Sequence, residues 1–296
     1  MNFQRTPAGL SNEYLFLGVD AIVFVEGGLS RSEHDVYAGA FDGESQDIAF
    51  WQRWFSELMP NLKIQFRAVG AKPTLHAIAL KIADGSVTHV YVAMDRDFDN
   101  LRGRIINSPK VLYTMGYSWE NDVWNAVIAE DVFYALCGVC RNTTAKAMKE
   151  ILAESFSAFD RDVYWATKAD FLCVIHDIAL LPRQSPRRVI KEATHGLPPK
   201  INKKAILLLM REAKTKRIGS INTNSRIRLE PRRDCCGHLI GAFAYSLLIY
   251  LFRRFCKRKS YPTELIDSIA MDKLFEKIRQ GSFDTLRAHY QHQLTA

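Results

Sequence analysis

The sequence of 296 residues lacks the features that mark most secreted and membrane-spanning proteins. Its six cysteines are scattered and form no dense disulfide framework, which favours a reducing compartment. The first residues contain no basic stretch followed by a long apolar run, as a secretory signal would. The longest apolar run, Leu239–Phe252, has 14 residues, whereas a membrane helix needs about 20. We therefore expect a cytoplasmic protein that has no membrane segment and buries this run as a helix or uses it for self-association.

Internal repeats are absent as well, and a composition of 48% hydrophobic and 24% charged residues is that of a globular protein. The net charge of +8 hides a strong asymmetry along the chain. Residues 1–135 hold 11 Lys and Arg against 17 Asp and Glu, whereas residues 136–296 hold 29 against 15. This polarity predicts an acidic site in the first half and a surface that faces a polyanion in the second.

Four apolar stretches predict strands, namely residues 21–28, 62–69, 88–94 and 110–114. Helical patterns lie between them, one beginning near Pro73 and another containing the aromatic run Phe50–Phe55, which we expect in the core. This alternation predicts an α/β fold with a parallel sheet flanked by helices. After about residue 120 the patterns are helical, including separate helices over 144–159 and 161–181, with a loop-rich connector over 182–204. We expect a catalytic domain over residues 1–130 and a mostly helical, basic region over 131–296.

Acidic residues stand where two of these predicted strands end. Glu26 ends "VFVEGG", while Asp95 and Asp97 end "VAMDRDFD", with Asp99 two residues further on. Function gathers at the carboxyl ends of parallel strands, and like charges this close need a cation between them. Mg²⁺ or Mn²⁺ suits them, because hard cations take carboxylate oxygens and keep several waters. In an extended chain Asp95 and Asp97 point to one side; Asp99 joins them or caps a turn, and Glu26 is a further ligand or the general acid/base.

The pair of motifs Glu26-Gly27 and Asp95-Arg96-Asp97 resembles the Toprim family, the catalytic domain of topoisomerases, bacterial primases and OLD-type nucleases. The run "YSWEND" (Tyr117–Asp122) is similar to one group of stand-alone, OLD-like Toprim proteins that includes effectors of the PARIS anti-phage defence system. The resemblance covers about residues 18–125. The spacer after Gly27 is longer than in compact Toprim domains, so the match of Asp35 to the family's helix aspartate stays open.

This resemblance implies a metal-dependent endonuclease in which Glu26, Asp95 and Asp97 are catalytic and Mg²⁺ or Mn²⁺ is the cofactor. The effector role implies a toxin of abortive infection that cleaves transfer RNA. It further implies an ABC-type ATPase partner that holds the nuclease inactive, and a possible homodimer once the nuclease is freed. We also consider a DNA nuclease and a non-catalytic protein that keeps a Toprim scaffold to bind nucleic acid or a partner. Dehalogenase-type phosphatases also use Asp-x-Asp, but after the first strand rather than the third.

Several further residues allow two interpretations. Glu120 either binds the metal or supports its ligands, or it is a carboxylate at a helix N-terminus that the helix dipole favours. Lys72 faces phosphate or is a plain surface lysine. Cys137 and Cys140 have zinc spacing without a second ligand pair.

The segment 182–233 is strongly basic, with 15 Lys and Arg against 3 Asp and Glu. Such density suits a phosphate backbone, although a solvated surface or an acidic protein partner would explain it too. The candidate nucleic-acid contacts are Arg187, Arg188, Lys203, Lys204, Lys214, Lys216 and Arg217.

Overall fold

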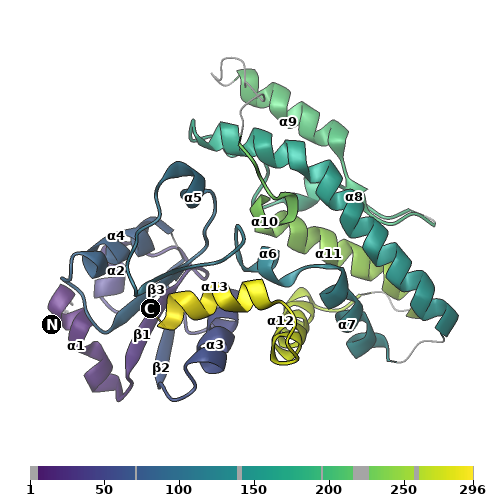
Figure 1. The fold of residues 1–296 in the computed structure, drawn as a ribbon. Helices are drawn as coiled ribbons and strands as arrows, with labels where there is room; N and C mark the ends of the chain where they lie inside the picture. Colours follow the sequence, from purple (N-terminus) through teal and green to yellow (C-terminus); the bar gives the residue numbers. More distant parts are fainter. Residues whose placement is uncertain are drawn as a thin grey trace. The chain divides into compact units, whose positions relative to one another are not determined.

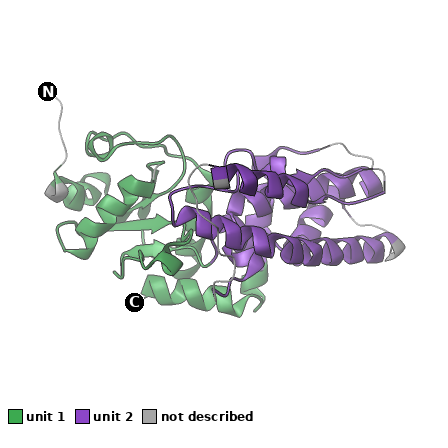
Figure 2. Ribbon diagram, turned by 90° about the horizontal axis from the view of Figure 1, so that it is seen from above, with its two compact units in different colours: residues 1–115, 277–296 green, residues 116–276 purple. Residues whose placement is uncertain are grey.

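The computed structural model describes residues 6–70, 72–138, 142–194, 196–215, 227–256 and 260–295. The chain forms two compact units, coloured separately in Figure 2. Unit 1 comprises residues 1–115 together with 277–296, and unit 2 comprises residues 116–276. The sequence had suggested a boundary near residue 130 and one uninterrupted C-terminal region. The end of the chain instead belongs to unit 1, which local sequence patterns do not reveal because it depends on tertiary packing.

Unit 1 is built on a four-stranded sheet in which all pairings are parallel (Figure 1). The predicted strands are confirmed, as β1 (Ala21–Val25), β2 (Ile64–Ala68), β3 (Val90–Met94) and β4 (Val111–Tyr113). The spatial order is β2-β1-β3-β4, with Val25 of β1 in register with Ala93 of β3. All five residues of β1 are buried, as expected for a parallel strand covered on both faces. The carboxyl ends of β1 and β3 therefore lie side by side.

Helices cover both faces of this sheet. On one face α1 (Pro7–Leu17), α2 (Glu33–Tyr37) and α4 (Lys72–Ala83) share a core with the strand residues Ile22 and Phe24. The other face carries α3 (Gln46–Leu58), whose Phe55 packs edge-on to Tyr91 of β3, and α13 (Asp284–Thr295). The aromatic run of α3 is buried, as predicted, and Trp54 stacks on Tyr290 of α13 at 4.1 Å between ring centroids.

The C-terminal helix α13 also protects the free edge of the sheet. β4 is an edge strand, so on one side the backbone of Tyr113 faces no neighbouring strand among the described residues. The amide of Gln293 accepts from Tyr113 N at 2.7 Å and donates to Tyr113 O at 2.9 Å. This side chain replaces a missing strand partner, which both satisfies the peptide group and blocks pairing with another chain.

Unit 2 is mostly helical, as predicted, and contains one small hairpin. Its elements are α6 (Trp119–Val123), α7 (Ala126–Cys137), α8 (Asn142–Val174), η1 (Pro186–Val189), β5 (Ile190–Lys191), β6 (Lys200–Ile201), α9 (Lys203–Thr215), α10 (Pro231–Asp234), α11 (Gly237–Leu251), the π-helical turn η2 (Phe252–Cys256) and most of α12 (Thr263–Arg279). The prediction of separate helices over 144–159 and 161–181 is wrong, because α8 is a single helix of 33 residues. No Gly or Pro interrupts α8, and Phe156 and Phe159 both pack on Phe243 of α11.

The helix near the C-terminus extends beyond the apolar run that it contains. α11 and η2 together form 20 residues, Gly237–Cys256, and within the described part of the chain this is the single helix long and apolar enough to cross a membrane. More than half of its apolar window is buried inside the structure, which fits a core helix of a soluble protein. Leu248 and Leu251 are fully buried. Of the two expectations for the apolar run, burial as a helix is confirmed at these two leucines, so they are not available as a self-association surface.

Candidate functional site

The predicted acidic residues of unit 1 meet where β1 and β3 end. Glu26 directly follows β1, and its Oε2 accepts a hydrogen bond from Asp95 N at 2.6 Å, which ties the two strand ends together. The chain then turns away through Gly27 and Gly28, both with positive φ, at 98° and 75°. A Cβ at Gly27 would overlap Asp47, and one at Gly28 would overlap Asp42. The Glu-Gly-Gly order is therefore a requirement of this turn.

A lysine supplies the positive charge that the aspartates need. Lys72 is the first residue of α4, and its Nζ lies 2.6 Å from Asp97 Oδ2 and 2.8 Å from Asp99 Oδ2. It also donates to Asp95 O at 2.5 Å. These three contacts are not those of a plain surface lysine, which was one of the two interpretations of Lys72. No local signal identifies this role, because the partners of Lys72 lie far along the chain and meet it only in the folded sheet.

The backbone after β3 decides which aspartates converge. β3 ends at Met94, and Asp97 has a φ of 50°, in the left-handed region that non-glycine residues rarely adopt. The extended chain expected through Asp97 is therefore not formed at that residue. Asp97 and Asp99, the latter at the start of the short helix α5 (Asp99–Arg102), both contact Lys72, and Asp95 adds its main-chain N–H and C=O to the cluster. A non-glycine residue in this left-handed conformation costs about 1–3 kcal/mol, and such residues cluster at functional sites.

The charges of the cluster are strongly coupled to one another. Burial, followed by the nearby Asp97 carboxylate, raises the pKa of Glu26 from 4.5 to about 7, although Lys72 acts in the opposite direction. Burial alone would lower the pKa of Lys72, but Asp97, Glu26 and Asp99 hold it above its ordinary value. The lysine therefore stays charged, while the environment of Glu26 favours a carboxyl that exchanges a proton near neutral pH.

A cavity lies directly beside the cluster. It has a volume of about 630 Å³ and is lined by Lys72, His76, Asp99 and Arg104, among others. Its size falls in the range of about 300–1,000 Å³ that is usual for ligand sites. Lys72 and Arg104 thus place two cationic groups next to the carboxylates, which suits a substrate that carries phosphate.

The cluster offers carboxylate oxygen atoms, which are the ligands that a hard metal ion prefers. Asp97 and Asp99 converge on one point, where Lys72 Nζ lies. One or two carboxylates with waters are the usual protein ligands of Mg²⁺, and Mn²⁺ shares this preference. No group of three or more His, Cys, Asp and Glu is arranged for a metal within the described ranges. A cation would therefore use this aspartate pair and would have to displace or join the ammonium of Lys72.

Two other candidates of the sequence have different surroundings. Asp35 forms a capping box with Ser32 at the start of α2, so its carboxylate serves that helix. Glu120 belongs to unit 2 and lies in the first turn of α6, in agreement with the interpretation as a carboxylate at a helix N-terminus. Ser118 Oγ donates to Glu120 Oε2, and Glu120 Oε1 lies 3.7 Å from His238 Nε2.

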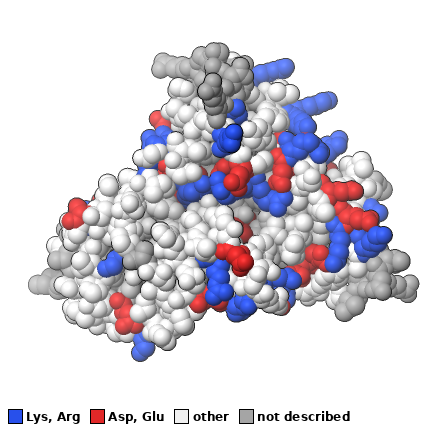
Figure 3. Space-filling model, in the orientation of Figure 1, with Lys and Arg blue, Asp and Glu red and all other residues white. Residues whose placement is uncertain are grey.

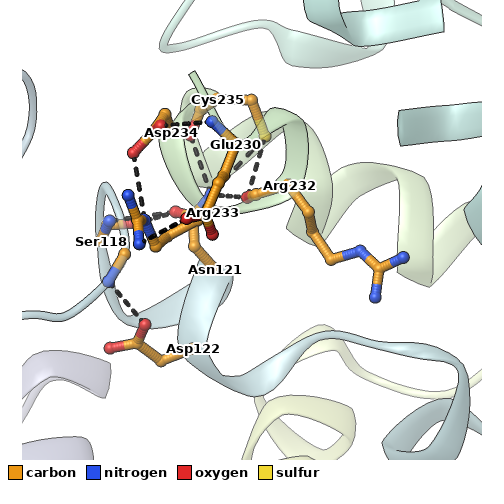
Figure 4. A network of polar contacts seen from close by, with 9 residues as sticks. Ser118, Asn121, Asp122, Glu230, Arg232, Arg233, Asp234 and Cys235 are labelled. Atoms are coloured by element: carbon orange, nitrogen blue, oxygen red, sulfur yellow. Dashed lines mark hydrogen bonds and ion pairs between the residues drawn. The ribbon is translucent and has the colours of Figure 1, made fainter. Parts of the chain in front are cut away.

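The "YSWEND" run organises the interior of unit 2 around α10 (Figure 4). Asn121 Nδ2 donates to Arg232 O at 2.7 Å and to Cys235 O at 2.9 Å. Tyr117 N donates to Arg233 O at 2.7 Å. Asp122 Oδ1 accepts from Gly116 N at 2.6 Å. Asn121 and Asp122 therefore have a structural role, because the main-chain groups that they bond would each cost about 1–3 kcal/mol if left buried without a partner.

An acidic residue in the same region makes the stability of unit 2 depend on pH. Burial, followed by the charges of Glu120 and Glu264, raises the pKa of Asp267 on α12 from 3.8 to about 7. Between about pH 4 and pH 7 the folded chain keeps this proton while the unfolded chain loses it, so stability falls as pH rises through that window. We expect Asp267→Asn, which cannot ionise, to be more stable than wild type, by a margin about 2–3 kcal/mol larger at pH 8 than at pH 5.

Urea denaturation at the two pH values measures this difference. Asp272→Asn is the matched control, since Asp272 is exposed on the same helix. An Asp267→Asn variant whose stability relative to wild type is the same at both pH values would contradict the assignment.

The basic candidates of unit 2 divide into paired and exposed residues. Lys203 Nζ lies 2.8 Å from Asp162 Oδ1, and Arg232 pairs with Asp160 at 2.6 Å, so acidic neighbours offset part of the predicted charge. Arg187 is exposed and lies over the Tyr245 ring, and Arg188 and Lys204 are exposed. On the face in Figure 3, blue side chains gather over α9, with acidic groups interleaved elsewhere. Lys216, Arg217 and the side chain of Lys214 lie outside the described residues, as does Cys140.

Comparison with known proteins adds no assignment to this geometry. No family model matches the chain, and no curated protein matches it. The fold class is that of an α/β protein with a parallel sheet, and its most distinctive site is the carboxylate–lysine cluster at the ends of β1 and β3. The function is therefore argued from these residues.

Proposed function

We propose that the chain is a Mg²⁺-dependent nuclease of the Toprim type, acting on RNA. The observation that carries this proposal is the meeting of Glu26, at the end of β1, with Asp97 and Asp99, after β3, beside a cavity with cationic walls. Parallel sheets bind ligands at such strand ends. The order of acidic motifs along the chain, Glu-Gly and then Asp-x-Asp, supports the Toprim type.

The residues of the cluster divide the work of phosphodiester hydrolysis. Asp97 and Asp99 would hold Mg²⁺ or Mn²⁺, with Asp95 beside them. The cation would supply positive charge that stabilises the developing charge on the phosphate oxygens. Glu26 either serves as a further ligand or moves a proton at its carboxyl group, near which the Asp95 N–H is already fixed. Lys72 neutralises the aspartates in the metal-free chain, and with a cation bound it would be available to a phosphate in the cavity that it lines.

The biological role that we propose is the toxic effector of an anti-phage abortive-infection system. Its substrate would be transfer RNA, and an ABC-type ATPase partner would hold it inactive. This part rests on the resemblance of the motifs and on the need to restrain a nuclease that attacks the cell's own RNA. A DNA nuclease, or a non-catalytic binding protein on the same scaffold, is the competing proposal.

Sequencing of RNA ends in cells that express the protein tests this proposal. We expect new transfer RNA ends with the wild-type chain and none with Glu26→Gln, which keeps the size of the side chain but removes its charge. Purified protein should cut transfer RNA but not duplex DNA when Mg²⁺ is added. Cleavage of DNA alone would favour the DNA nuclease, and an absence of cleavage with tight RNA binding would favour the binding protein.

The exposed basic residues give a separate prediction about nucleic-acid binding. Charge reversal of Arg188 and Lys204 to Glu should weaken RNA binding and lower the slope of log affinity against log salt by about two, one for each lost phosphate contact. Fluorescence anisotropy over a salt series measures both quantities. Reversal of Lys146 and Lys149 on α8, outside the 182–233 segment, is the charge-matched control. Equal slopes for both double variants would assign the basic segment to another role.

A further inference from the structure

Unit 2 contains a second cavity that the proposed nuclease site does not use. It has a volume of about 700 Å³, within the range of about 300–1,000 Å³ that suits a small ligand. The residues on which the argument depends come from two segments: Glu192 and Thr194 from the loop after β5, and Ser246, Tyr250, Arg253 and Arg254 from α11 and η2. The cavity therefore lies between the hairpin loop and the end of the apolar helix.

One wall of this cavity presents two guanidinium groups. They are consecutive residues of the π-helical turn η2, a distortion that is frequent at functional sites. Arg254 Nη1 donates to Tyr250 Oη at 2.6 Å, and Tyr250 Oη donates to Gly196 O at 3.2 Å in the opposite loop. The Arg254 guanidinium also lies over the Tyr250 ring, 5.8 Å from its centroid. These contacts fix the group in place and leave further N–H donors for a ligand.

The charge of this wall is not neutralised within the part of the chain that the structure describes. Neither Arg253 nor Arg254 forms an ion pair there, in contrast to Arg183, Arg232 and Arg233 of the same unit. Both arginines are exposed to solvent. Planar guanidinium groups bind phosphate through two parallel hydrogen bonds, so this pair is suited to a phosphate or diphosphate group.

A hydroxyl without a partner lies deeper on the same helix face. Ser246 precedes Tyr250 by one helical turn and lines the cavity, yet only 4% of it is exposed. Its Oγ has no hydrogen-bond partner among the described residues. A buried hydroxyl without a hydrogen-bond partner destabilises the fold. A polar ligand that enters the cavity could remove this cost.

The opposite wall carries groups of a different kind. Glu192 is an exposed carboxylate and Thr194 offers a hydroxyl, both on the hairpin loop. A carboxylate repels phosphate but accepts hydrogen bonds from sugar hydroxyls or amino groups. The walls thus suit a molecule that has phosphate at one end and hydrogen-bond donors at the other. From this pairing we infer that unit 2 binds a nucleotide, with its phosphates on Arg253 and Arg254 and its sugar or base toward Glu192.

Isothermal titration calorimetry of the full chain with the four common nucleoside diphosphates, and with pyrophosphate alone, tests this inference. At least one nucleoside diphosphate should bind at least tenfold more tightly than pyrophosphate. Arg253→Met and Arg254→Lys should each weaken nucleotide binding at least tenfold. Glu192→Gln should weaken nucleotide binding without weakening pyrophosphate binding. Arg211→Met, exposed on α9 and not among the cavity residues, should bind as the wild type does.

Two results would overturn the inference. One is equal affinity for pyrophosphate and every nucleoside diphosphate, which would indicate a simple anion site. The other is wild-type binding by the Arg253→Met variant, an exposed substitution that should not disturb folding. Because Glu26 belongs to unit 1, Glu26→Gln should bind the nucleotide normally, so the outcome is independent of the nuclease assay.

Discussion

Asp97→Asn and Asp99→Asn should each lower RNA cleavage about 100-fold or more, because each removes an anionic oxygen from the point at which the two side chains converge. Asparagine has nearly the shape of aspartate, so the fold should survive. Each variant keeps one of the two carboxylates beside Lys72. Initial cleavage rates at a fixed Mg²⁺ concentration measure the loss, and circular dichroism checks the fold.

Asp84→Asn is the control for this pair, since Asp84 follows the far end of α4, where its Oδ1 accepts a hydrogen bond from Ser86 N. That variant should cleave at the wild-type rate. Raising the Mg²⁺ concentration should restore part of the activity of the Asp97 and Asp99 variants, because a weakened site fills at higher concentration. Full activity of both variants at ordinary Mg²⁺ levels would exclude the aspartate pair as metal ligands.

The sheet and the positions of the acidic residues could be predicted because they depend on local patterns. β1 and β3 are short apolar runs that end in charge, and helical spacing between them requires a crossover. Since parallel strands share one carboxyl edge, Glu26 and the aspartates had to lie near that edge. The sequence thus sufficed for the fold class and for the neighbourhood of the site.

The arrangement within the site depended on features that local patterns do not encode. Asp97 has a left-handed backbone, and Asp97 and Asp99 meet at Lys72. The sequence left the role of Asp35 open, and in the fold its carboxylate caps its own helix. The pairing of Lys203 with Asp162 likewise joins segments far apart in the chain. Each of these outcomes is decided by tertiary contacts, which compete with and override sequence spacing.

Lys72→Met should destabilise the metal-free protein by about 2–3 kcal/mol, because it leaves the carboxylates of Asp97 and Asp99 close together without a cation. The side chains of Lys72 and Asp99 are only 18% and 12% exposed, so solvent screens this repulsion weakly. Methionine keeps most of the length of the lysine stem, and the loss should therefore come from charge rather than from packing. Urea denaturation in the presence of a chelator measures it.

Lys81→Met on the same helix is the matched control. Lys81 pairs with Glu33, but both side chains are about one third exposed, and such surface pairs contribute about 0–1 kcal/mol. Added Mg²⁺ should stabilise Lys72→Met more than wild type or Lys81→Met, since a bound cation takes the position of the missing ammonium and shifts unfolding by mass action. Equal stabilisation of all three proteins by Mg²⁺ would mean that the cation does not bind where Lys72 lies. A loss for Lys72→Met no greater than that for Lys81→Met would mean that the lysine does not hold the aspartates together.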